Sequence, residues 1–183
     1  AYHYCDGLSW HRYPQSDASV LRPEREGLTD IRDRIQNAET LVAAVNASQG
    51  RTGADALIWS IGEFNGKNGT AVHTFGAGQM FAGVYGLAMR HGADFAAAWS
   101  LREAAENNRG PQDFSLLDTN DLIPRSTYWH TRLVSRHFSG RYLEGTPSVS
   151  SSTSDILVYG AEDAGLGRVS VMILNRGATA EPY

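Results

Sequence analysis

The chain has 183 residues, of which 42% are hydrophobic and 20% are charged, a composition typical of one globular domain or of one domain with part of another. The net charge of −4 and the absence of a lysine or arginine cluster argue against a nucleic-acid-binding surface, because such surfaces are strongly basic. No apolar run approaches the roughly 20 residues that cross a bilayer. We therefore expect neither a nucleic acid nor a membrane as a partner.

The first third of the sequence predicts a strand, a helix and a second strand. The aromatic-rich stretch 4–13 predicts a strand that ends at Pro14, and the polar stretch 14–26 predicts a loop. Residues 28–46 predict an amphipathic helix, because apolar residues recur there every three or four positions. These residues are Leu28, Ile31, Ile35, Ala38, Val42 and Val45. The apolar run 56–63 then predicts a strand that ends on a glutamate.

The middle of the sequence repeats this alternation. It predicts a helix over about 71–90 with Gly92 as its C-terminal cap, and a small-residue strand over 94–101. A long polar loop, 102–123, leads to a helix over 125–139. The apolar face predicted for that helix consists of Trp129, Leu133, Val134 and Phe138. Helices of this length between short strands predict βα units and a parallel sheet.

The pattern changes near residue 146. A serine- and threonine-rich stretch, 145–155, leads to two alternating strands around a glycine turn within 156–175. This is the pattern of an antiparallel hairpin. We therefore expect an α/β unit over 1–145 and the start of an all-β unit over 146–183.

Polar and aromatic residues gather where the predicted strands end. In a parallel α/β sheet, functional residues collect at the carboxyl ends of the strands. The first strand ends on His11 and Tyr13, the second on Glu63 followed by Asn65, and the third on Trp99 followed by Arg102 and Glu103. Sugars offer hydroxyl groups to hydrogen-bond and an apolar ring face for an aromatic side chain, so this set predicts a sugar site.

Each of these residues also has an ordinary interpretation. A glutamate at a strand end is more often solvated than catalytic, and a lone histidine is more often structural. Trp10, Trp59 and Trp129 are expected in the core, whereas Trp99 is expected to face the carboxyl end of the sheet. The combination of residues favours the sugar site more than any single member does.

Other kinds of site have less support in the sequence. The six histidines include no H-E-x-x-H motif, so no metal is expected. The stretch "GEFNGKNGT" lacks the spacing of a phosphate-binding loop, and no Gly-x-Ser-x-Gly elbow is present. We expect no cofactor.

The stretches "DGLSWHRYP", "IWSIGEFN", "FAAAWSL" and "PRSTYWHTRLVSRHFSGRYL" together resemble the last part of the clan A glycoside hydrolases. These are retaining (β/α)8-barrel enzymes such as arabinofuranosidases, β-xylosidases and β-agarases. The resemblance covers residues 1–175. It implies the carboxyl-terminal part of a barrel, about strands six to eight, followed by a partial antiparallel β-sandwich.

The resemblance also implies a role for each site residue. Glu63 matches the nucleophile, and Trp99 matches the aromatic platform on the eighth strand. His11 and Tyr13 match a catalytic His-x-Tyr pair on the sixth strand, in which Tyr13 would hydrogen-bond Glu63 and His11 would bind substrate hydroxyls or the nucleophile. Asn65 and Arg102, which follow the second and third predicted strands, are further candidates for binding a carbohydrate substrate.

One departure from the clan pattern is informative. The clan places its acid/base glutamate in an Asn-Glu dipeptide at the end of the fourth strand, and no Asn-Glu occurs in these 183 residues. Retaining hydrolysis needs two carboxyl groups, about 5–5.5 Å apart. We therefore expect the chain to be a fragment that is inactive alone and whose partner is the rest of its own barrel, upstream of Ala1.

The alternative is a non-catalytic carbohydrate-binding or interaction module derived from a glycosidase barrel. It would keep the aromatic platform and lack the acid/base chemistry. Lys67 is the only lysine among 16 basic residues, and the acidic, arginine-rich composition suggests a secreted or periplasmic protein that degrades a polysaccharide.

Overall fold

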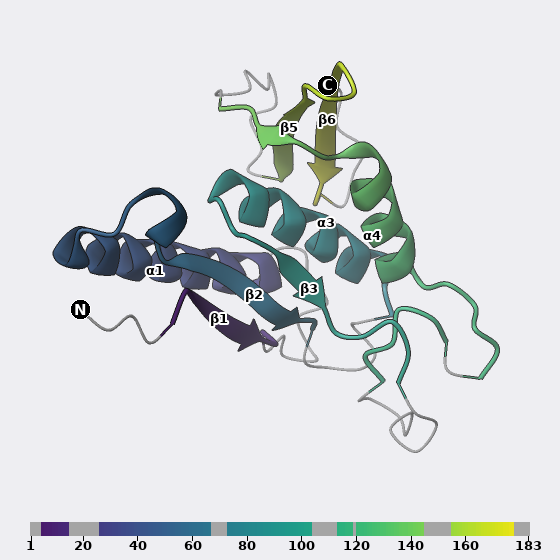
Figure 1. The fold of residues 1–183 in the computed structure, drawn as a ribbon. Helices are drawn as coiled ribbons and strands as arrows, with labels where there is room; N and C mark the ends of the chain where they lie inside the picture. The colour runs from purple at the N-terminus through teal and green to yellow at the C-terminus, as the bar shows by residue number, and fades with distance from the viewer. Residues whose placement is uncertain are drawn as a thin grey trace.

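The computed structural model describes residues 5–14, 26–66, 73–103, 113–118, 120–144 and 155–177. Its elements alternate between strands and helices over most of the chain (Figure 1). They are β1 Gly7–Arg12, α1 Glu26–Gln49, a 3-10 turn Gly53–Asp55, β2 Ile58–Phe64, α3 Phe75–Arg90, β3 Ala96–Ala98, α4 Ser126–His137, β4 Arg141–Tyr142, β5 Ile156–Asp163 and β6 Arg168–Asn175.

The strands form two separate sheets. The first has the order β1-β2-β3 and is parallel throughout, with α1 connecting β1 to β2 and α3 connecting β2 to β3. The second has the order β4-β5-β6 and is antiparallel. The prediction of a mixed α/β chain with a parallel sheet followed by an antiparallel hairpin is confirmed. The predicted boundary at 145/146 lies outside the described residues, and β4 had no counterpart in the predictions.

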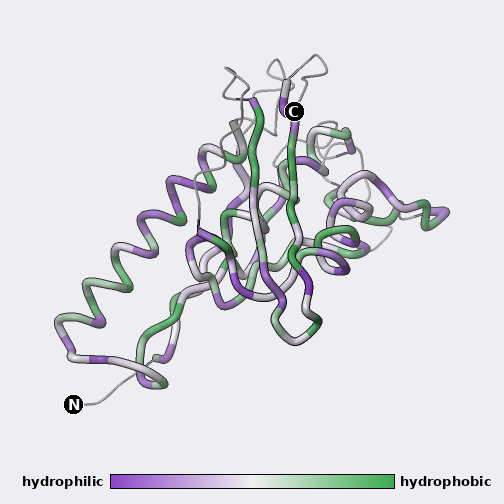
Figure 2. Tube along the Cα trace, turned by 90° about the horizontal axis from the view of Figure 1, so that it is seen from above, coloured by the Kyte–Doolittle hydropathy of each residue, from purple (hydrophilic) through white to green (hydrophobic). Residues whose placement is uncertain are grey.

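The predicted stripe of α1 is the face that the helix buries. Leu28, Ile31, Ile35, Ala38 and Val42 are all buried, and Val45 packs beside them. Hydrophobic and hydrophilic residues alternate along this helix in Figure 2, as expected for a helix with one face on the core. The stripe packs on the same side of the first sheet as α3.

Helix α3 lies between the two sheets (Figure 1) and has the most extensive buried surface among the helices. It begins after Thr74, whose hydroxyl accepts the N–H of Ala77, and it ends before Gly92, which adopts φ 69° as the predicted cap. Its outer side meets the ring of Tyr159 from β5, where a Cβ on Gly86 would lie 2.7 Å from the ring atoms. A glycine at this position therefore lets the second sheet approach the helix closely.

Helix α4 departs from the prediction. Phe138, just after its end, is buried, and Val134 packs on the core, but Leu133 is 58% exposed and Trp129 is 45% exposed. The assignment of Trp129 to the core is wrong, whereas Trp59 is buried and Trp10 packs against the core. Helix α4 packs mainly on α3, and Trp129 instead contacts Tyr128 and the guanidinium of Arg132 at the surface.

The second sheet has one face on α3 and one exposed face. Tyr159, Ala161 and Leu174 are buried on the first of these faces, whereas Val169, Val171 and Ile173 are exposed on β6. Within the described part of the chain, no helix is long and apolar enough to cross a membrane.

Candidate functional site

The carboxyl end of β1 directs His11 and Tyr13 away from the helices. Leu8 and Trp10 pack on the core. Because side chains alternate between the two faces of a strand, Ser9 and His11 lie on the opposite face of the sheet. The side chain of His11 is 56% exposed there. Tyr13 follows two residues later, and its phenol reaches the end of the neighbouring strand.

At Gly62, β2 has one residue more than its neighbours. Trp10 pairs with Ile61, and the next residue of β1, His11, pairs with Glu63. On the other side of β2, Ala96 pairs with Ile61 and Ala98 with Phe64, so three residues of β2 oppose two of β3. Both neighbouring strands therefore place an extra residue in β2 between Ile61 and Phe64, which is a β-bulge.

The bulge decides where the carboxylate points. Ile61 and Phe64 are both fully buried on the helix side of the sheet, although they are three residues apart. In a regular strand, side chains alternate with a period of two, and Glu63 would share the face of Ile61. The extra residue instead places Glu63 on the face of His11. Glycine inside a strand is a sequence signal for a bulge, although no bulge was predicted at this position.

Glycine at this position also leaves room for the imidazole. A Cβ on Gly62 would lie 2.5 Å from Ser9 Oγ and 2.9 Å from His11 Nε2. Ordinary carbon contacts are longer, so a side chain here would displace the ring or the hydroxyl.

The structure brings the three residues predicted as catalytic into contact. The phenol of Tyr13 donates a hydrogen bond of 2.9 Å to Glu63 Oε2, and His11 Nδ1 lies 3.4 Å from the same oxygen. Burial raises the pKa of Tyr13, and the hydrogen bond to Glu63, the charge of Glu63 and the charge of Glu103 raise it further. Tyr13 therefore keeps its proton and acts as a hydrogen-bond donor to the carboxylate.

At the end of β3, Trp99 lies on the sheet's other side from the helices. Ala96 and Ala98 pack on the core, so the side chain that follows them points to the opposite face. The indole of Trp99 is 44% exposed, and its Nε1 donates to Glu103 Oε1 at 3.0 Å. Arg102, which follows it, is exposed.

Asn65 holds the loop at the end of β2. The residue is only 1% exposed, and its Nδ2 donates to the backbone carbonyls of Trp99 and of Phe114, the latter at 2.9 Å. Its Oδ1 accepts the N–H of Gly66 at 2.7 Å. The amide is thus bonded to backbone groups, which supports a role for Asn65 in positioning this loop.

Segment 113–118, which lies within the polar loop predicted over 102–123, closes this end of the sheet. Arg125 donates to Asp113 Oδ2 at 2.5 Å, to Asp118 Oδ2 at 2.9 Å and to the carbonyl of Ser115 at 2.8 Å. Burial raises the pKa of Asp113, but the hydrogen bonds from Arg125 and Ser115 outweigh this effect and lower it below the ordinary value. The segment also carries Phe114, whose ring meets the edge of the Tyr13 ring with centroids 5.4 Å apart.

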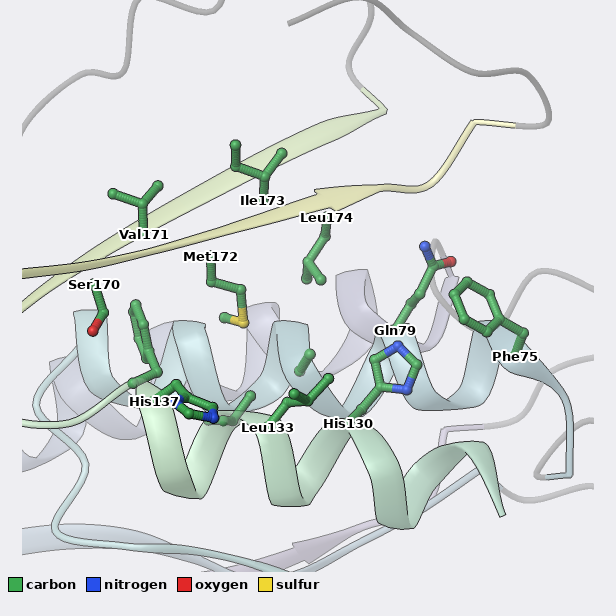
Figure 3. A pocket seen from close by; sticks show the side chains of 13 residues that line it. Phe75, Gln79, His130, Leu133, His137, Ser170, Val171, Met172, Ile173 and Leu174 are labelled. Carbon is green, nitrogen blue, oxygen red and sulfur yellow. The ribbon is translucent and has the colours of Figure 1, made fainter. Parts of the chain in front are cut away.

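A separate hollow of about 350 Å³ lies between α3, α4 and β6 (Figure 3). Its lining is mainly apolar, and His130 and His137 contribute from α4. His130 is bonded back to the carbonyl of Ser126 at 2.8 Å. None of the residues around Glu63 line this hollow. It lies where α3 and α4 pack against the second sheet and is distinct from the site around Glu63. Among the described residues, no group of three or more His, Cys, Asp or Glu side chains is arranged to hold a metal.

The fold is glycosidase-like. No model of a known protein family matches the sequence, and no curated protein matches it. Among solved structures, the chain is similar to a family 51 α-L-arabinofuranosidase from Bifidobacterium longum, with a TM-score of 0.65 and 12% sequence identity. The match covers 96% of this chain and 40% of that chain, so the chain spans about two fifths of its neighbour's length. At this identity the likeness supports only a distant relationship.

Proposed function

We propose that this chain is the carboxyl-terminal part of a retaining glycoside hydrolase of clan A, with Glu63 as its nucleophile. The observation that carries the proposal is the contact of Glu63 with Tyr13 and His11, at the carboxyl end of the central strand of a parallel sheet. The glycosidase-like fold and the exposed indole at the end of the next strand agree with it.

The geometry around Glu63 suggests which oxygen attacks. In the part of the chain that the structure describes, the contacts from Tyr13 and His11 both reach Oε2. Oε1 is then the oxygen that bonds to the anomeric carbon as the glycosidic bond breaks and the leaving oxygen takes a proton from the acid/base residue. Water, deprotonated by that same residue, next displaces Glu63 and releases the sugar with its original anomeric configuration.

The acid/base carboxyl group comes, in this proposal, from upstream strands of the same barrel. Among the described residues, Glu103 is another carboxylate at this end of the sheet, but its two oxygens accept the N–H groups of Trp99 and Phe114. Because both of its oxygens already accept N–H groups, Glu103 is poorly placed to donate a proton to a substrate. Strand β1 pairs only with β2 among the described strands, which leaves an edge for a preceding strand.

The test uses the full-length polypeptide that contains this chain and 4-nitrophenyl α-L-arabinofuranoside as a substrate, a choice taken from the similar solved structure. Glu63→Ala should lose nearly all turnover, and added azide should restore release of 4-nitrophenol while giving a glycosyl azide of inverted configuration. Glu144→Gln, an exposed carboxylate after β4, is the matched control and should keep full activity. Retained turnover in Glu63→Ala would reject the proposed nucleophile.

A second candidate is a non-catalytic carbohydrate-binding module, and the exposed indole of Trp99 favours it. It predicts that the wild-type polypeptide binds arabinan or xylan oligosaccharides in calorimetry without hydrolysing them. Trp99→Ala should then remove binding, whereas Glu63→Ala should leave it. Hydrolysis by the wild type decides in favour of the enzyme.

A further inference from the structure

Glu103 joins the end of β3 to segment 113–118. Its Oε1 accepts the indole N–H of Trp99 at 3.0 Å, and its Oε2 accepts the backbone N–H of Phe114 at 3.3 Å. Its own backbone N–H donates to the hydroxyl of Ser115 at 2.8 Å. Both oxygens of the carboxylate and the backbone of the residue are therefore engaged at once.

The segment that holds Glu103 is itself fixed in place. Arg125 ties it to the start of α4 through Asp113 and Asp118, and Asp113 is only 1% exposed. Glu103 is thus bonded to a well-anchored loop on one side and to an aromatic side chain on the other.

The aromatic side chain needs such a partner. Trp99 is 44% exposed, so packing covers only about half of it, and an exposed indole moves among several rotamers. A hydrogen bond from Nε1 to an ionised carboxylate is stronger than a neutral one and has a defined direction. It selects one orientation of the ring before any ligand arrives.

The same residue connects the indole to the nucleophile's surroundings. Phe114, whose N–H bonds to Glu103, packs its ring against Tyr13, the donor to Glu63. The charge of Glu103 also contributes to raising the pKa of Tyr13. Glu103 therefore lies close to both the aromatic side chain and the Tyr13–Glu63 pair.

We propose that Glu103 is a positioning residue that fixes the indole of Trp99 as a preformed stacking surface for a sugar ring next to Glu63. The sugar as ligand rests on the proposed function. The orientation of the indole by Glu103 does not, and can be tested without any substrate. Preforming the surface lowers the entropy cost of binding, so loss of Glu103 should weaken substrate binding and leave the chemical step nearly unchanged.

The first test is a two-dimensional ¹H–¹⁵N NMR spectrum of the full-length polypeptide. Trp99→Phe identifies the indole N–H resonance of Trp99 as the one that disappears. In Glu103→Gln this resonance should move upfield, because a neutral amide oxygen replaces the carboxylate as acceptor, and in Glu144→Gln it should stay in place. An unchanged Trp99 resonance in Glu103→Gln overturns the proposal.

The second test is a double-mutant comparison of hydrolysis kinetics. Glu103→Gln should raise KM about tenfold, the loss expected for a hydrogen bond to a charged group, while kcat stays within about twofold. Trp99→Ala should raise KM at least as much, and the double variant should be no worse than Trp99→Ala alone, because Glu103 acts through the indole. Losses that multiply in the double variant contradict the proposal.

The two tests separate the possible failures. If the wild type hydrolyses no arabinofuranoside, the proposed function is in doubt, yet the resonance of Trp99 still decides the role of Glu103. If Glu103→Gln does not fold, Trp99→Phe removes the same hydrogen bond from the donor's side. That variant should reproduce the rise in KM, and an unchanged KM contradicts the proposal.

Discussion

Tyr13→Phe removes one hydroxyl group and so tests the orientation of Glu63 while leaving the packing around it unchanged. The phenol donates a hydrogen bond of 2.9 Å to Oε2 of Glu63, and the ring contacts Phe114 with centroids 5.4 Å apart. Phenylalanine keeps the ring contact and loses only the hydrogen bond. His11, at 3.4 Å from the same oxygen, is too distant to replace it without moving.

The size of the effect follows from the charge of the acceptor. A hydrogen bond to a charged group contributes about 1.5–3 kcal/mol, and about 1.4 kcal/mol corresponds to a factor of ten. If Tyr13 orients Glu63 for attack, Tyr13→Phe should lower kcat by roughly 10- to 150-fold, with little change in KM. The free energy of unfolding should change by less than about 1 kcal/mol, because the exchanged ring fills the same space and water can replace the phenol at the Glu63 side chain, which is 28% exposed.

The assay is release of 4-nitrophenol from 4-nitrophenyl α-L-arabinofuranoside by the full-length polypeptide, with thermal unfolding measured in parallel. Tyr142→Phe, on β4 in the second sheet, is the matched control and should leave kcat unchanged. A Tyr13→Phe variant that keeps more than about a third of the wild-type kcat would refute the orienting role. A large loss of stability would show that the hydroxyl supports the fold instead.

Three further perturbations of the full-length polypeptide test other parts of the structure. Gly62→Ala places a methyl group 2.9 Å from His11 Nε2 and should lower kcat/KM about tenfold. Its Tm should stay nearly constant, because alanine restricts the unfolded chain and so offsets the strain by about 0.4–1 kcal/mol. A kcat/KM at the wild-type level would contradict the close contact. Gly86→Ala places a methyl group 2.7 Å from the ring of Tyr159 on β5 and should lower the free energy of unfolding in urea by about 1–3 kcal/mol. A variant more stable than the wild type would show that the second sheet can shift to accommodate the methyl group. Burial raises the pKa of Asp113, but hydrogen bonds led by that of Arg125 outweigh it, so the folded pKa lies below the unfolded value of 3.8. The stability that this carboxylate provides is then present above pH 3.8 and is lost as the pH falls through the folded pKa. The difference in free energy of unfolding between the wild type and Asp113→Asn should therefore shrink as the pH is lowered. A difference that does not depend on pH would contradict this role of Asp113.

The order of the elements could be predicted from the sequence because each signal for it is local. The stripe of α1 and the cap at Gly92 depend on residues a few positions apart, and both are found where the periodicity and the glycine placed them. His11, Tyr13 and Glu63 could be grouped because parallel strands bring their carboxyl ends to the same edge.

The parts that were missed depend on contacts distant in sequence. Segment 113–118 reads as a polar loop, and only the fold shows that Asp113 is buried beneath Arg125. Similarly, α4 has more apolar residues than α3 covers, so its sequence alone does not predict which of them are exposed. Trp129 is the clearest case.

The bulge at Gly62 has a consequence for comparing related sequences. A relative that kept the glutamate but lacked one residue between the positions of Ile61 and Phe64 would restore regular alternation in β2. Its isoleucine and phenylalanine would still face the helices, and the glutamate between them would still lie on the face of His11. The bulge is therefore the means by which β2 accommodates one extra residue, and a one-residue gap at Gly62 in an alignment would not indicate that the glutamate had left this face. The same seven residues of β2 paired without a bulge would instead turn the carboxylate toward the helices.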